Sequence, residues 1–201
     1  MVVWYQFTIE RKGEHPVRHL SESKGWVHAD GYAGFNGLFG KDKASEVACM
    51  AHIRCKFVDV QQSQGSVIAE EAIKRIAKFY VVEKEVRGHS TKDQAAIRQK
   101  KARPVFDDLE TWLHAQLPRI SGKSPLAKAI RYALSPMPKT RSYIDNDFLE
   151  LENNTCERAV KPVAIGRKNW MFAGSERGGK AMAIAFTLIK TAKLNGVDPQ
   201  D

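Results

Sequence analysis

Two carboxylates lie in the two most distinctive segments of this chain. Asp30 follows the apolar stretch Trp26 to Ala29 and precedes a glycine, and Glu157 follows Asn153 to Cys156 beside a basic segment. Metal-dependent phosphodiester chemistry on nucleic acid needs acids held together on a positively charged surface, because their oxygens bind Mg²⁺ or Mn²⁺. Asp30 and Glu157 are therefore our candidate catalytic and metal-binding pair.

Each acid by itself is weak evidence for such a site. Most Asp-Gly pairs, such as Asp30-Gly31, are ordinary turns. Neighbouring Glu and Arg side chains, such as Glu157 and Arg158, are usually solvated surface. Composition and spacing alone would favour those two simpler interpretations.

Six basic side chains are candidate DNA contacts, namely Arg54, Lys56, Arg158, Lys161, Arg167 and Lys168. The alternative is a solvated charged face, which is where most Lys and Arg occur. The clustering of Arg158 to Lys168 beside Glu157 favours contact with phosphates. Trp170 and Phe172 in the same segment can stack on an unpaired base, although such aromatics more often belong to a core.

The spacing Cys-x₂-His-x₂-Cys of Cys49, His52 and Cys55 offers three soft metal ligands. A structural zinc site needs four ligands, and Cys156 is remote in sequence. We therefore prefer a buried junction between a strand and a helix here, since cysteine is commonly buried.

The composition indicates a globular protein with a polyanionic partner. The chain has 201 residues, a formal net charge of +9 and three cysteines, and its isoelectric point is near 9.5. An odd cysteine count argues against a disulfide framework. The segment beginning at Met1 lacks the basic region and long apolar core typical of a signal peptide, and no run of roughly 18 apolar residues occurs. We therefore expect no membrane partner and a reducing, cytoplasmic location.

The apolar and β-branched stretches of the first third predict strands. Val2 to Ile9 and Trp26 to Ala29 each read as a strand, the second ending at Asp30. His15 to Lys24 is compatible with a short helix. Glu46 to Met50 predicts a short buried strand that runs into a helix over 51–60. This order favours a mixed α/β sheet.

The rest of the chain has helical periodicity. Apolar residues recur at helical spacing from Ser66 to about Leu134, and prolines end this region at 135–138. Asn154 or Thr155 can cap a short helix to about Val160. A loop or hairpin is expected over 166–175. A final amphipathic helix over 179–194 would carry Ala181, Ala185, Leu188 and Ala192 on one face.

Several motifs, all in the same order along the chain, resemble the IS66-type insertion-sequence transposases of the DDE (Asp-Asp-Glu) group. Residues 153–158 resemble that family's Asn-Asn-x-x-Glu-Arg motif, and Gly-Arg-Lys-Asn-Trp and Ala-Gly-Ser-x-x-Gly-Gly follow at 166–170 and 173–179. Residues 30–36 resemble Asp-Gly-Tyr-Ala-Gly-Tyr-Asn, with Phe35 in place of Tyr. Residues 49–57 resemble Cys-Trp-Ala-His-x-Arg-Arg-Lys-Phe. The resemblance covers nearly the whole chain.

The resemblance implies a ribonuclease-H-like fold in which Asp30 and Glu157 are the second and third acids. The first acid has no counterpart, and Glu10 and Glu14 do not match its position. We therefore expect an α/β protein with a ribonuclease-H-like mixed sheet that is N-terminally truncated and has an inserted helical region. Its expected parts are a first core segment at 1–61, the insertion at 62–140, and a second core segment with the Glu-bearing helix at 141–201.

The activity that the resemblance implies is DNA strand cleavage followed by strand transfer at two Mg²⁺ or Mn²⁺ ions. The partners would be transposon ends and target DNA in the bacterial nucleoid, with homo-oligomers and helper proteins possible. The missing acid implies impaired catalysis by these residues alone. The alternative is a non-catalytic DNA-binding or regulatory remnant of a transposase.

Overall fold

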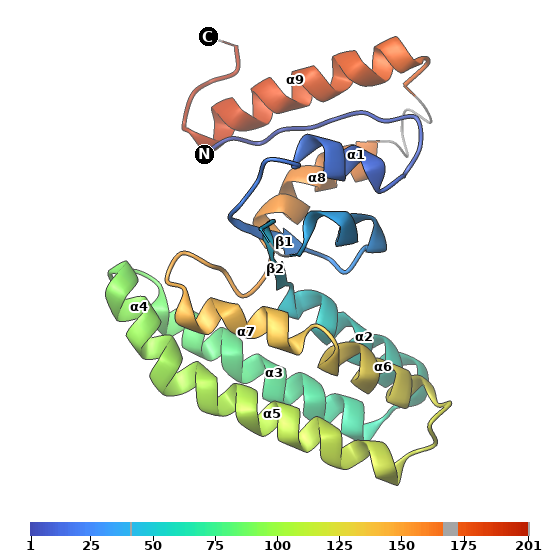
Figure 1. Cartoon of the computed structure of the whole chain (residues 1–201), viewed down its shortest axis with the longest axis vertical. Coiled ribbons are helices and arrows are strands. Elements are labelled where there is room, and N and C mark those ends of the chain that lie inside the picture. Colours follow the sequence, from blue (N-terminus) through green and yellow to red (C-terminus); the bar gives the residue numbers. More distant parts are fainter. Residues whose placement is uncertain (41, 167–172, 201) are drawn as a thin grey trace. The chain divides into compact units, whose positions relative to one another are not determined.

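A computed structural model describes residues 1–40, 42–166 and 173–200 of the chain (Figure 1). The chain divides into two compact units. One unit comprises residues 22–153, and the other combines residues 1–21 with residues 154–201. The described residues are mostly helical and include a small parallel sheet, so the fold is of the α/β kind.

The sheet of the 22–153 unit consists of two short parallel strands. β1 spans Trp26–Ala29 and β2 spans Ser45–Ala48, and the register pairs Trp26 with Ser45 and Ala29 with Ala48. Parallel strands need a long connection. Here the connection contains the 3₁₀-helix η1, Ala33–Leu38. Because the strands are parallel, their carboxyl ends lie at the same edge of the sheet.

Helices make up the remainder of this unit. They are α2 Met50–Gln64, α3 Val67–Val86, α4 Thr91–Ile97, the π-helical turn η2 Arg98–Ala102, α5 Arg103–Gln116, the 3₁₀ turn η3 Leu117–Arg119, α6 Pro125–Leu134 and α7 Met137–Asp145. Ser66, Ser90 and Ser124 cap α3, α4 and α6, each accepting a hydrogen bond from the backbone N–H three residues later. Such caps satisfy N–H groups that the first turn of a helix leaves unpaired.

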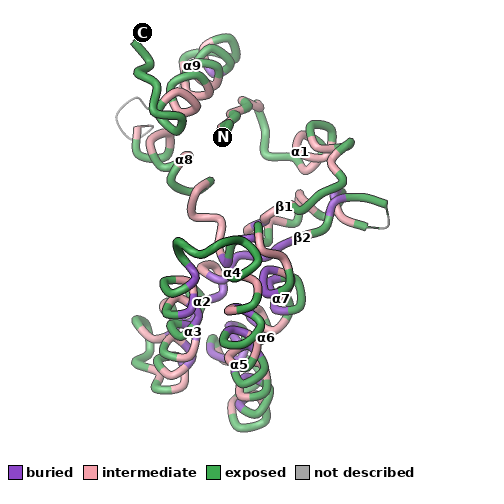
Figure 2. Tube along the Cα trace, turned by 90° about the vertical axis from the view of Figure 1, so that its left-hand side faces the viewer, coloured by how far each residue is buried: buried purple, intermediate pink, exposed green. Residues whose placement is uncertain are grey.

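The hydrophobic core lies among these helices, and buried residues concentrate on α2, α3, α5, α6 and α7 (Figure 2). Phe57 of α2, Ile76 of α3 and Ile130 of α6 are fully buried. The rings of Phe79 and Phe106 meet edge to face, with centroids 5.3 Å apart. β2 joins this core through Val47, so the bundle supports the sheet from one side.

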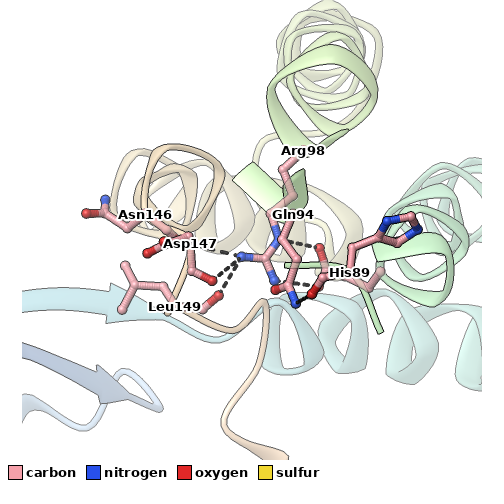
Figure 3. Close-up of polar contacts among 7 residues, drawn as sticks. His89, Gln94, Arg98, Asn146, Asp147 and Leu149 are labelled. Atoms are coloured by element: carbon pink, nitrogen blue, oxygen red, sulfur yellow. Dashed lines mark hydrogen bonds and ion pairs between the residues drawn. The ribbon is translucent and has the colours of Figure 1, made fainter. Parts of the chain in front are cut away.

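A buried cation ties the end of the bundle together. Arg98 is only 4% exposed, and its guanidinium donates two hydrogen bonds to Glu83 of α3, at 2.9 and 2.8 Å. Its Nη1 also points at backbone carbonyls that follow α7, including that of Leu149 at 2.9 Å (Figure 3). The Tyr143 ring lies beside the same guanidinium, with its centroid 5.3 Å from Cζ. Arg98 thus holds residues 146–149 against α3.

The other unit contains three helices among its described residues. They are α1 Glu14–His19, α8 Asn154–Gly166, which contains Pro162, and α9 Glu176–Leu194. The N-terminal segment runs along α9 in an extended conformation. The backbone N–H groups of Val3 and Tyr5 donate to the hydroxyls of Thr191 and Thr187, at 3.1 and 3.0 Å.

Most elements of the 22–153 unit confirm the sequence predictions. β1 has the predicted bounds, β2 lies within one residue of its predicted start, and α6 begins after the predicted Ser124 cap. The division of the chain at residues 61 and 140 remains a prediction.

Three predictions about local structure were wrong. Val2 to Ile9 is not a strand, because side chains of α9 rather than another strand receive the N–H groups of Val3 and Tyr5. The prolines at 135–138 do not end the helical region: Pro138 lies in the first turn of α7, where no N–H is needed. α8 continues past Val160 to Gly166 despite Pro162.

The face predicted to be apolar on the last helix exists, but it is exposed in the described structure. Leu188 is 66% exposed and Ala181 and Ala185 are also exposed, whereas Gly179 is buried. The expected loop at 166–175 falls largely on residues 167–172, which lie outside the described part of the chain.

We predict that Arg98→Ala lowers the free energy of unfolding by about 3–5 kcal/mol, because it leaves the Glu83 carboxylate and three carbonyls without their buried cation. Urea denaturation followed by circular dichroism measures the change. The matched control is Arg103→Ala, which removes an exposed ion pair with Asp145 and should cost at most about 1 kcal/mol. Equal losses in the two variants would contradict the role given to Arg98.

Candidate functional site

The candidate site begins at the carboxyl edge of the sheet. Ala29 and Ala48 end the two strands, pair with each other, and are 2% and 4% exposed. Asp30 and Cys49 are the next residues, so both emerge at the same edge. In open α/β sheets this edge is where ligands bind.

A tight turn fixes the Asp30 carboxylate. Its Oδ1 accepts a hydrogen bond from the backbone N–H of Tyr32 at 3.0 Å. Gly31 between them has φ = +81°, a left-handed conformation that suits glycine. The Asp-Gly pair predicted as a possible turn is therefore a turn, and it holds the carboxylate at the end of β1.

Tyr132 of α6 lies against this turn. Its hydroxyl oxygen would be 3.3 Å from a Cβ added to Gly31. Burial raises the pKa of the Tyr132 phenol, and the Asp30 carboxylate raises it further. The phenol therefore keeps its proton at neutral pH and can donate a hydrogen bond at the Asp30 turn.

Lys56 of α2 belongs to the same neighbourhood. Its Nζ lies 5.2 Å from the centroid of the Tyr132 ring, within the range of a cation–π contact. Sequence reasoning selected Lys56 and Asp30 but not Tyr132. A single tyrosine on an amphipathic helix carries no signal of its own, and only the packing of α6 on α2 brings it to the turn.

The chain returns to this edge of the sheet just before α8. The backbone N–H of Met50 donates to the Leu151 carbonyl at 3.1 Å, and that of Asn153 donates to the Cys49 sulfur at 3.5 Å.

Tyr80 of α3 donates its hydroxyl hydrogen to Glu152 at 2.8 Å. Burial and this hydrogen bond raise the pKa of Tyr80. Residues 151–153 are therefore fixed beside the start of α2.

The remaining predicted contacts are on α2 and α8. Arg54 is exposed on α2, and Arg158 and Lys161 are exposed on α8. Arg158 donates to the Thr155 hydroxyl at 3.3 Å. Four residues named from the sequence, Arg167, Lys168, Trp170 and Phe172, lie outside the described residues.

Glu157 is exposed in the first turn of α8. It belongs to one compact unit, whereas Asp30 belongs to the other. Their meeting at one metal site stays a prediction.

The cysteine motif behaves as the junction that we preferred. Cys49 is 2% exposed between β2 and α2, whereas Cys55 is exposed on α2. A separate group of possible ligands occurs near the N-terminus, where ligand atoms of Glu10, Glu14 and His15 lie within 4.8 Å of one another. Glu10 is already paired with Lys12 at 2.5 Å.

Comparison with known proteins identifies the family. The family model described as "Transposase IS66 family" matches residues 1–181, so this chain belongs to the IS66 family of transposases. Both candidate acids lie within the matched region. Among the described residues, none of the helices has the length and apolar character needed to cross a membrane.

Similar curated proteins occur in Sinorhizobium fredii (strain NBRC 101917 / NGR234). The uncharacterized protein y4hP is 35% identical over 212 residues, which cover 98% of this chain and 38% of that protein. The uncharacterized protein y4jD is 37% identical over 203 residues, which cover 98% of this chain and 40% of that protein. This chain thus spans about two fifths of their length. No solved structure matches it.

We predict that His28 makes stability depend on pH. Burial lowers the pKa of His28 from 6.5, with Glu150 partly opposing, and neither ring nitrogen has a hydrogen-bond partner among the described residues. Because the unfolded state takes up the proton first, stability should fall as pH drops below about 6.5.

Thermal unfolding between neutral and mildly acidic pH measures this dependence. His28→Gln should lose part of it, whereas His114→Gln, at an exposed position on α5, should retain it. If both variants and the parent chain show the same dependence of melting temperature on pH, His28 is not the cause of it.

Proposed function

We propose that this chain is part of the catalytic domain of a DNA transposase, with Asp30 and Glu157 as two acids of a DDE site. The observation that carries the proposal is the family match over residues 1–181, which includes both acids in their motifs. The parent activity would be cleavage of a DNA strand and transfer of its 3′ end to a new phosphodiester.

The sheet supports a ribonuclease-H-like arrangement. Asp30 follows a strand at the carboxyl edge, where the second acid of such a fold is expected, and α2 follows β2 directly. The helices from α3 to α7 would correspond to the insertion expected between the second and third acids.

Chain length supports the pairing of the acids. Asn153 is hydrogen-bonded to Cys49, which follows the partner of Ala29 in the sheet. Glu157 is 157 − 153 = 4 residues further on. Four residues span at most about 14 Å even when extended, so the Cα of Glu157 stays within that distance of the Cα of Asn153.

The donor set fits a hard divalent cation. Asp30 and Glu157 supply carboxylate oxygens, which Mg²⁺ and Mn²⁺ prefer. The Tyr32 N–H uses one of about four acceptor positions on the Asp30 carboxylate. A bound ion there would stabilise negative charge on the attacking and leaving oxygens of the phosphodiester.

The chain's own residues would hold and orient the DNA. Lys56 lies over the Tyr132 ring, and the exposed Arg54, Arg158 and Lys161 offer further positive charge for phosphates. Arg167 and Lys168 belong to the same proposal from their sequence positions. Tyr132 would border the turn, because its hydroxyl oxygen lies 3.3 Å from the position that a Cβ on Gly31 would occupy.

One observation favours a second candidate function. The first acid of the DDE set has no counterpart in these 201 residues. Two acids hold one ion loosely, and a pair of ions about 4 Å apart usually needs a bridging carboxylate. A DNA-binding or regulatory role without catalysis is therefore the alternative for this chain.

We predict that the chain binds Mn²⁺ weakly and that Asp30→Asn and Glu157→Gln each weaken binding by more than about tenfold, because each removes a ligand. Isothermal titration calorimetry or Mn²⁺ electron paramagnetic resonance measures the affinity. Asp59→Asn, at an exposed acid on α2, is the matched control and should bind as the parent does.

Two results would count against the proposed site. Unchanged affinity in both acid variants would remove Asp30 and Glu157 from it. Loss of binding in Glu14→Gln alone would move the metal to the N-terminal group of Glu10, Glu14 and His15.

A nicking assay on transposon-end DNA separates the two candidate functions. We expect no metal-dependent nicking by the 201-residue chain, since the bridging acid is missing. Nicking that Glu157→Gln abolishes would refute this expectation and show that another acid completes the site.

A further inference from the structure

A pocket of about 220 Å³ lies within the unit formed by residues 1–21 and 154–201. The extended N-terminal segment, the start of α8 and the end of α9 supply its walls. Its lining residues are Val3, Thr155, Arg158, Ala159, Lys190, Lys193 and Leu194. Three of them are cationic, and none of these described lining residues is acidic. We call this the basic pocket.

The helices of this unit stabilise only one of the three cations of the basic pocket. Lys193 lies in the last turn of α9, where the helix dipole stabilises a cation. Lys190 is one turn earlier on the same face, and like charges at that spacing destabilise a helix by about 0.2–0.5 kcal/mol. Arg158 lies one turn from the N-terminus of α8, where the dipole offers a cation no stabilisation. An anion in the pocket would offset both costs.

Hydrogen-bond donors in the pocket suit an oxyanion. Arg158 donates to the Thr155 oxygen, and a hydroxyl that accepts a bond still has its own hydrogen to donate. That hydroxyl lies at the start of α8, the positive end of a 13-residue helix. Guanidinium, ammonium and hydroxyl groups together are the usual partners of a phosphate.

We propose that the basic pocket binds a backbone phosphate of DNA, with Lys190 and Lys193 as contacts in addition to Arg158. The inference rests on the proposed function, since it assumes that the chain handles DNA. The aliphatic side chains of Val3, Ala159 and Leu194 would face the sugar of the same nucleotide. The contact would be independent of base sequence, because phosphates carry none.

The test measures the salt dependence of DNA binding by the full chain. Fluorescence anisotropy with a short labelled duplex gives the slope of log K against log salt, which reports the number of phosphates neutralised. The double variant Lys190→Gln/Lys193→Gln should flatten the slope by about one to two units. The control Lys123→Gln/Lys128→Gln removes the same charge from exposed positions in the other unit and should leave the slope unchanged.

Each outcome decides a different point. An unchanged slope in the pocket variant, or equal flattening in the control, overturns the pocket while DNA binding stands. No salt-dependent binding by the parent chain overturns the proposed function as well. A further measurement uses inorganic phosphate at matched ionic strength. If phosphate raises the melting temperature of the parent chain but not of the pocket variant, and the pocket variant keeps the DNA slope of the parent, the pocket binds free phosphate. The assignment of the pocket to DNA would then be wrong.

Discussion

The arrangement of the 22–153 unit depends on one buried cation. A guanidinium that is 4% exposed must be paired, because an unpaired buried charge costs several kcal/mol. Glu83 satisfies one side of Arg98, and the carbonyls after α7 satisfy the other. The carbonyls after α7 are thereby held at Arg98, and two residues after Leu149 the chain bonds to the start of α2 through the Leu151 carbonyl.

Local signals in the sequence predicted the elements that local physics determines. An apolar stretch ending in Asp-Gly predicted β1, and Ser124 before Pro125 predicted the start of α6. The predictions failed where contacts with residues far along the chain determine the local structure. Val2 to Ile9 has the composition of a strand, yet its N–H groups bond to threonines nearly two hundred residues later. No periodicity in the segment itself reports that contact.

The residues of the candidate site likewise fall into those that the sequence could predict and those that it could not. Asp30 could be selected because residues 30–36 form a contiguous motif that resembles the family's, whereas the Asp-Gly pair alone indicates only a turn. Tyr132 could not, because it reaches the turn only through the packing of α6 on α2. Lys190 and Lys193 were not singled out either, since two lysines on a final helix look like solvated surface. Only the extended segment along α9 and the start of α8 turn that surface into a pocket.

The hydrogen bond from Met50 to Leu151 has a consequence for how the protein is made. It joins residues that are 151 − 50 = 101 positions apart, and β1, β2 and α2 all precede the second of them. During synthesis, domains fold as their chain emerges, at about 5–20 residues per second. The start of α2 must therefore wait several seconds for its partner after it leaves the ribosome. Until Leu151 appears, the Met50 N–H at the start of α2 lacks this partner and is open to water and to other chains.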